Sequence, residues 1–236
     1  MARVARRLSR DHGVIEPLQT AQSVDGQVEE LRQAIELHCQ IPAVLIGYSW
    51  GAWLSLLLAA RYPELCGKLI LVSTPPLIET SAAQLRTSRL DRLDDAEKVE
   101  YAAAIAALAD PTAPDSDHWL ERLGRLGGKA DAYAPVDRTD APGDIRVSAR
   151  IYRAVWKEAS EMRRSGELLR RVQMVRCLVV AIHGDADSSP AAGVAGPLSD
   201  AIEQFRFTVL GRCGHTPWLE RYATDSFYST LLAEIG

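Results

Sequence analysis

The stretch IPAVLIGYSWGAWLSLLLAARYP, at residues 41–63, constrains this chain more than any other. It opens as an apolar run typical of a buried strand, breaks at two glycines around a serine, and resumes with helical spacing. A strand that turns directly into a helix leaves no room for side chains beside the turn, so we interpret Gly47 and Gly51 as sterically required. Ser49 is then predicted to have a strained backbone that raises its hydroxyl above the strand end.

Apolar runs elsewhere in the chain predict the rest of the sheet. Strands are expected at 14–19, 43–48, 68–73 and 175–184, with a further one at 205–211. Most are continuously apolar rather than alternating, which suits parallel strands covered on both faces. Helical patterns lie between them at 24–38, 51–63 and 226–235. The alternation predicts an α/β fold with a mostly parallel sheet flanked by helices.

The stretch from residue 76 to 173 departs from this alternation. Its pattern is helical and rich in charge at 94–110 and 150–172, with a turn-prone middle at 137–144. A structureless loop of that length would be unusual inside a compact domain, so we predict a helical cap over one end of the sheet. The expected domains are the first part of the core at 1–75, the helical cap at 76–173 and the second part of the core at 174–236.

Composition and charge argue against several classes of partner. A net charge of -4 and a pI near 5.8 give no positive field for nucleic acid or an anionic membrane. The four cysteines show no metal-binding spacing, and they indicate reduced thiols in a cytosol-like compartment. With no signal-peptide pattern, membrane span, nucleotide loop or metal-ligand cluster, we expect a cytoplasmic protein without metal or cofactor.

A serine hydroxyl becomes a nucleophile only when a base takes its proton, so the sequence must also supply a histidine and an acid. His215 in GRCGHTPWLER follows the last strand pattern on a loop rich in glycine and proline. Asp185 and Asp187 both follow the strand at 175–184, where catalytic groups gather in α/β sheets. Either aspartate could form the turn, and the interpretation favours Asp187 as the acid.

Together these segments resemble the α/β-hydrolase family. GYSWG carries the nucleophile motif, HGDAD places the family's acid on Asp187, and CGHTPW places its histidine on His215. Tryptophan after the serine, with a helical cap before the acid strand, is similar to the branch of proline iminopeptidases and cap-bearing esterases. The resemblance implies that Ser49 is the nucleophile and that the Trp50 backbone N–H binds the oxyanion.

One part of the family pattern has no counterpart. The family's oxyanion strand ends in HG well before the nucleophile, whereas the DHG at 11–13 precedes the wrong strand. The expected fold is therefore N-terminally incomplete, and the strand at 14–19 should either slide into the vacancy or pair poorly. Loss of one oxyanion donor typically costs on the order of a hundred- to a thousand-fold in turnover, so catalysis would be impaired.

Two functions follow from these residues. The first is a serine hydrolase acting on a small-molecule ester or amide, with a pocket lined by Tyr48, Trp53, Trp156 and Trp218. Glu158 and Glu161 could hold the free amine of an aminopeptidase substrate, although solvated helix charges and ester hydrolysis are favoured. The second is a catalytically impaired protein that binds a ligand or partner. An exposed sheet edge would also allow a homo-oligomer through strand pairing.

Overall fold

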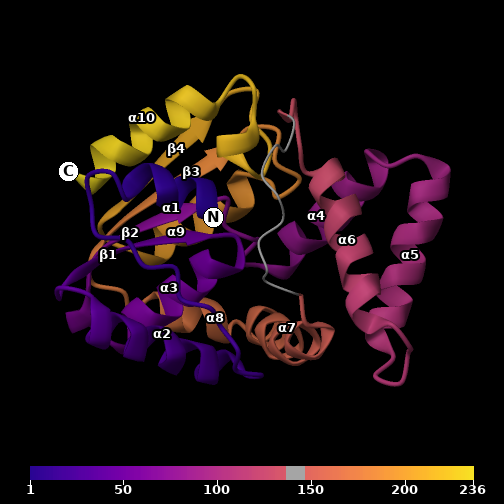
Figure 1. Cartoon of the computed structure of the whole chain (residues 1–236), viewed down its shortest axis with the longest axis horizontal. Coiled ribbons are helices and arrows are strands. Elements are labelled where there is room, and N and C mark those ends of the chain that lie inside the picture. Colours follow the sequence, from indigo (N-terminus) through magenta and orange to yellow (C-terminus); the bar gives the residue numbers. More distant parts are fainter. Residues whose placement is uncertain (137–146) are drawn as a thin grey trace.

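Helices and parallel strands alternate along the chain in the computed structural model, which describes residues 1–136 and 147–236 (Figure 1). The first part contains α1 (Ala2–Leu8), α2 (Val24–His38), β1 (Ala43–Tyr48), α3 (Trp50–Arg61), η1 (Pro63–Leu65) and β2 (Cys66–Val72). The middle contains α4 (Glu79–Asp91), α5 (Asp95–Ala109), α6 (Ser116–Ala130), α7 (Ala149–Arg164) and α8 (Glu167–Val172). The last part contains β3 (Leu178–Gly184), α9 (Ala192–Ala201), β4 (Phe205–Leu210), η2 (Pro217–Leu219) and α10 (Thr224–Ile235).

The four strands form one parallel sheet in the order β1-β2-β3-β4. This confirms the α/β fold and four of the predicted strands, whose ends differ from expectation by three residues or fewer. Val72 pairs with Tyr48 on one side and with Ile182 on the other, so the carboxyl ends of the first three strands are level. Side chains that follow different strands therefore meet at one edge of the sheet.

The predicted strand at 14–19 is wrong, because this segment has no regular secondary structure and does not join the sheet. Its apolar side chains face solvent rather than a core, since Leu18 is 61% exposed and Val14 is 37% exposed. Pro17 has no N–H to donate to a neighbouring strand. The segment is irregular, and β1 lies at the edge of the four-stranded sheet.

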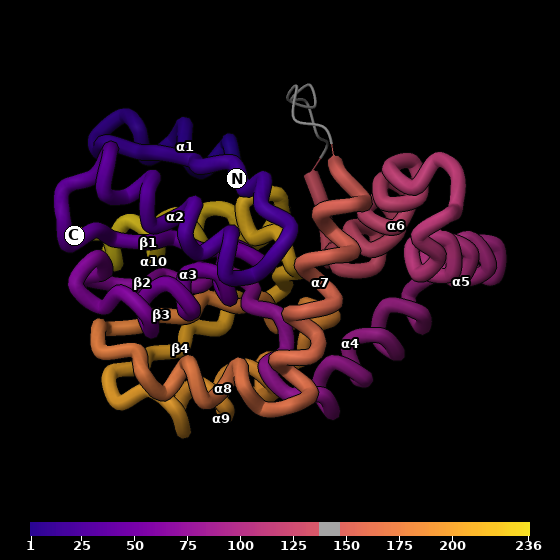
Figure 2. The backbone as a smooth tube through the Cα atoms, turned by 90° about the horizontal axis from the view of Figure 1, so that it is seen from below, coloured from indigo at the N-terminus to yellow at the C-terminus, as the bar shows by residue number. Residues whose placement is uncertain are grey.

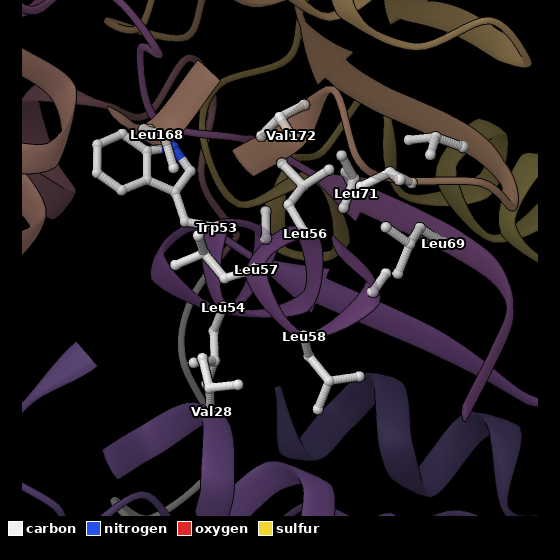
Figure 3. Packing of buried hydrophobic residues seen from close by; sticks show 14 of the residues in the cluster. Val28, Trp53, Leu54, Leu56, Leu57, Leu58, Leu69, Leu71, Leu168 and Val172 are labelled. Carbon is white, nitrogen blue, oxygen red and sulfur yellow. The ribbon is translucent and has the colours of Figure 1, made fainter. Parts of the chain in front are cut away.

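Helices cover both faces of the sheet (Figures 1 and 2). On one face α2, α3, α8 and α9 share an apolar cluster with β2, and Figure 3 shows Trp53, Leu56 and Leu69 within it. On the other face α1 and α10 pack against side chains such as Ile70. Adjacent residues of β2 thus enter opposite clusters. Each fully buried side chain of this size contributes roughly 1.5–3 kcal/mol to the free energy of folding.

Helices α4 to α8 occupy the segment predicted to form the cap. Figure 2 shows α4, α5 and α6 extending beyond the sheet, whereas α8 lies in the core cluster beside α3. The predicted helix at 150–172 is broken into α7 and α8 at Gly166, whose φ of 76° favours glycine. The turn-prone stretch at 137–144 lies outside the described residues. The domain boundaries given above stay a prediction.

Candidate active site

Ser49 forms the turn between β1 and α3. Its φ of 51° and ψ of −120° lie in a region that L residues rarely adopt, and its N–H donates to the Val72 carbonyl at 3.0 Å. A Cβ on Gly47 would lie 2.4 Å from the Gly51 carbonyl oxygen, so no larger residue fits there. The strained turn is consequently held by the neighbouring strand and by a close backbone approach.

The expectation that Gly51 is also sterically required is wrong. A Cβ at this position would meet nothing within 4 Å. Gly51 is the second residue of α3, and it faces open space rather than the β1 backbone. The close approach of strand and helix therefore restricts one glycine of the motif and leaves the other free.

His215 reaches Ser49 from the loop after β4. Its Nε2 lies 3.1 Å from the Ser49 Oγ, and its Nδ1 lies 2.7 Å from Oδ2 of Asp187. The imidazole also lies beside the Tyr48 ring, with 5.2 Å between centroids. The backbone N–H of His215 donates to the Asp131 carbonyl at 2.8 Å. The structure thus joins the three predicted side chains in one hydrogen-bonded row.

The two aspartates after β3 have different partners. Asp187 is 6% exposed, and its Oδ1 accepts the N–H of Ser189 at 2.8 Å while Oδ2 contacts His215. Asp185 instead accepts the N–H of Cys213 at 3.0 Å. Asp187 therefore orients the imidazole, and Asp185 ties the loop after β3 to the loop that carries His215.

Burial and charge act against each other in this row. Burial alone would lower the pKa of His215, but the charge and hydrogen bond of the Asp187 carboxylate, together with the Asp131 charge, hold that pKa above its ordinary value. Burial likewise opposes ionisation of Asp187, while the adjacent imidazole and the Ser189 N–H keep its pKa below the ordinary value. The arrangement stabilises an imidazolium beside a carboxylate, which is the state formed when a histidine takes the proton of a serine.

A second histidine, His183, lies against the acid from inside β3. It is 1% exposed, its Nε2 lies 3.6 Å from Oδ2 of Asp187, and the same nitrogen donates to the Ser189 carbonyl at 2.8 Å. Because Ser189 also donates to Asp187, His183 supports the turn that holds the carboxylate. The only sequence signal for this role is the position of His183, four residues before Asp187.

The Trp50 N–H lies at the first position of α3, where helical N–H groups have no partner within the helix. Among the backbone hydrogen bonds of the described residues, none uses this N–H as a donor. The helix dipole also places partial positive charge at this end. Trp50 therefore offers one free donor at the residue after Ser49, and its contact with an oxyanion stays a prediction.

The predicted pocket residues fall into two groups of contacting aromatic rings. Trp53 is 1% exposed, donates to the Pro75 carbonyl, and stacks on Trp156 of α7 at 5.9 Å between centroids. Tyr48 and Trp218 meet edge to face at 4.7 Å on the side of His215. The structure joins these side chains in two aromatic pairs, and their contact with a substrate stays a prediction.

Glu158 and Glu161 of α7 are occupied elsewhere. Oε2 of Glu158 accepts the N–H of Val24 at 2.8 Å, at the start of α2, and Glu161 pairs with Arg164 on the same helix. Both line a groove of about 760 Å³ between α2, α7 and α8 that includes none of the three residues of the hydrogen-bonded row. They are therefore not in the position that an amine-binding pair would need.

The segment after α6 is tied to the loop of His215 by residues that sequence reasoning missed. Glu220 is 1% exposed, and its carboxylate accepts the N–H groups of Tyr133, Ala134 and Gly214 at 2.9, 2.7 and 3.1 Å. A Cβ on Gly214 would lie 2.2 Å from the Asp131 carbonyl oxygen, so the two segments are in direct contact. The bonds from Glu220 to Tyr133 and Ala134 join positions 87 and 86 residues apart in sequence, which no local pattern reveals.

Residues 1–136 and 147–236 contain no group of three or more His, Cys, Asp or Glu residues able to hold a metal ion. Within the same ranges, no helix combines the length and apolar character needed to cross a bilayer.

Comparison with known proteins assigns the chain to a family. A sequence profile described as "Alpha/beta hydrolase family" matches residues 6–224. The chain belongs to the alpha/beta hydrolase family. Membership supports hydrolase activity in general and agrees with the resemblance inferred from the three motifs.

Solved alpha/beta hydrolases share the fold at low sequence identity. VinJ superposes with a TM-score of 0.60 at 18% identity, covering 91% of this chain and 72% of VinJ. Proline iminopeptidase from Mycobacterium smegmatis gives a TM-score of 0.56 at 16% identity, covering 91% of this chain and 71% of that structure. At these identities the likeness shows the fold alone, so the proposed branch within the family stays a prediction.

One curated relative matches a shorter stretch. This chain is 28% identical over 82 residues to 2-(acetamidomethylene)succinate hydrolase from Mesorhizobium japonicum. The match covers 35% of this chain and 30% of that protein, so it spans less than a third of the relative's length.

Proposed function

We propose that this protein is a serine hydrolase that cleaves an ester or amide bond of a small molecule through an acyl-enzyme. The observation that carries the proposal is the row of contacts from the Ser49 Oγ to His215 at 3.1 Å and from His215 to Asp187 at 2.7 Å. Nucleophile, base and orienting acid need this order and these distances for proton transfer.

The first half of the reaction forms the acyl-enzyme. The Ser49 Oγ bonds to the substrate carbonyl carbon while its proton passes to Nε2 of His215, and the Trp50 N–H donates to the developing oxyanion. Collapse of the tetrahedral intermediate breaks the bond to the alcohol or amine, which leaves with the proton from Nε2. Asp187 remains ionised and holds the imidazolium in place.

The second half uses the same groups in the same roles. Water attacks the acyl carbon and gives a proton to Nε2 of His215. Collapse then breaks the bond to the Ser49 Oγ, which takes that proton back, and the carboxylic acid is released. The low pKa of Asp187 and the raised pKa of His215 both favour the charge-separated state of each step.

Ester hydrolysis fits the site better than release of an amino acid from a peptide. The two glutamates that could hold a free amine, Glu158 and Glu161, already bind Val24 and Arg164 away from the hydrogen-bonded row. The aromatic rings near Ser49 suit an apolar acyl or leaving group instead. A cytoplasmic location and a homo-oligomer are further proposals, which rest on the cysteine usage and the edge position of β1.

Labelling by a fluorophosphonate probe tests the proposal, because the probe forms a covalent bond only with an activated serine. We expect labelling of the wild-type protein, its loss in Ser49→Ala, and its retention in Ser55→Ala, which removes a buried hydroxyl from the same helix. Folded wild-type protein that does not label would contradict the proposal and favour the binding protein without turnover. A panel of p-nitrophenyl esters and amino-acid arylamides then separates ester from amide preference.

A further inference from the structure

An ion pair of the predicted cap contacts the backbone of the candidate base, His215. The Arg89 guanidinium donates from Nε to Oδ1 of Asp131 at 2.9 Å and from a terminal nitrogen to Oδ2 at 2.5 Å. Asp131 is 3% exposed, and its backbone carbonyl accepts the N–H of His215 at 2.8 Å. One residue therefore binds α4 through its side chain and the catalytic loop through its main chain.

We propose that Arg89 and Asp131 act as a positioning pair for His215, holding its loop against the cap and cancelling each other's charge at the imidazole. The inference rests on the proposed function for its catalytic meaning. The pair is bidentate, with the Asp131 side chain buried and the Arg89 side chain 26% exposed, and two parallel hydrogen bonds fix the orientation of the guanidinium relative to the carboxylate. Neither partner touches the Ser49 Oγ, and both act through His215.

The two charges act on the imidazole in opposite directions. The Asp131 carboxylate raises the pKa of His215, the Arg89 guanidinium lowers it, and both effects are smaller than those of burial and of Asp187. A charge next to a buried base is screened little by solvent, so removing one partner exposes His215 to the other. Removing both partners should leave the pKa of His215 close to its wild-type value.

Other titratable groups stay constant across the variants. Tyr48 and Asp187 contact the imidazole itself. The segments that pack around its loop carry His183, Asp185, Arg92, Cys213 and Glu220. Any difference between variants of the pair therefore reports on Arg89 and Asp131.

The experiment measures the titration of the His215 imidazole by NMR between about pH 5 and pH 9, with the signal assigned from a His215→Gln spectrum. The decisive variant is Asp131→Asn. It removes the carboxylate charge and keeps the backbone carbonyl that accepts the His215 N–H. Arg89 stays charged in this variant, because an arginine cannot lose its proton. We expect the pKa of His215 to fall in Asp131→Asn and to rise in Arg89→Met. The double variant should titrate near the wild type.

Two controls separate charge from packing. Arg125→Met removes an exposed cap arginine that pairs with Glu100, and we expect no change in the titration of His215. The double variant keeps the test valid if Arg89→Met alone unfolds, since it leaves no unpaired buried charge. An unchanged or raised pKa of His215 in Asp131→Asn would overturn the proposal. So would a double variant in which the pKa of His215 differs from the wild type as much as in a single variant.

The readout does not depend on turnover. If the wild-type protein fails to label with a fluorophosphonate while the titrations shift as expected, the serine hydrolase proposal fails and the positioning pair stands. If the enzyme is active, the acidic limb of its kcat/KM profile should move to lower pH in Asp131→Asn and to higher pH in Arg89→Met. Activity without those shifts would refute the positioning pair and leave the serine hydrolase proposal standing.

Discussion

Replacing Glu220 by glutamine tests how strongly the cap holds the loop of His215. The carboxylate is 1% exposed and accepts three backbone N–H groups at 2.7–3.1 Å, from Tyr133, Ala134 and Gly214. A glutamine oxygen can keep two of these bonds, but its NH₂ group then faces the third N–H donor. The change loses one charge-assisted bond and leaves one buried donor unpaired, which costs about 2–4 kcal/mol.

Thermal and urea unfolding measure this cost. For a chain of 236 residues we expect the melting temperature of Glu220→Gln to fall by about 4–16 °C. Glu203→Gln changes an exposed glutamate to the same amide and should remain within about 0.5 kcal/mol of the wild type. If Glu220→Gln melts within about 2 °C of the wild type, the three bonds do not carry the energy assigned to them.

The other predictions concern the serine turn and pH. Gly47→Ala should abolish fluorophosphonate labelling and lower the melting temperature, because its Cβ would lie 2.4 Å from the Gly51 carbonyl oxygen, whereas Gly51→Ala should label normally. The labelling rate should rise with pH as His215 loses its proton, with a midpoint above the ordinary imidazole value of about 6.5. The stability due to that raised pKa is complete below about pH 6.5 and is lost as pH rises through the folded-state value, which urea unfolding across pH would detect.

Local sequence signals predicted the elements that carry the candidate site. An apolar run, a glycine at a close approach and an amphipathic continuation fix β1, Ser49 and α3, because backbone sterics act over a few residues. The same kind of signal located the strands that precede Asp187 and His215. It failed at 14–19, where an apolar composition alone cannot show whether a neighbouring strand is there to pair with.

The sequence by itself thus determined the α/β order and the three side chains that a serine hydrolase would need. The sequence already favoured Asp187 over Asp185, but only tertiary structure shows its contact with His215, the open space around Gly51, and the bonds from Glu220 that join Tyr133 and Ala134 to the histidine loop. The physical reason is distance along the chain. His215 lies 166 residues from Ser49 and 28 from Asp187, and such contacts depend on how the strands and loops pack rather than on any local pattern.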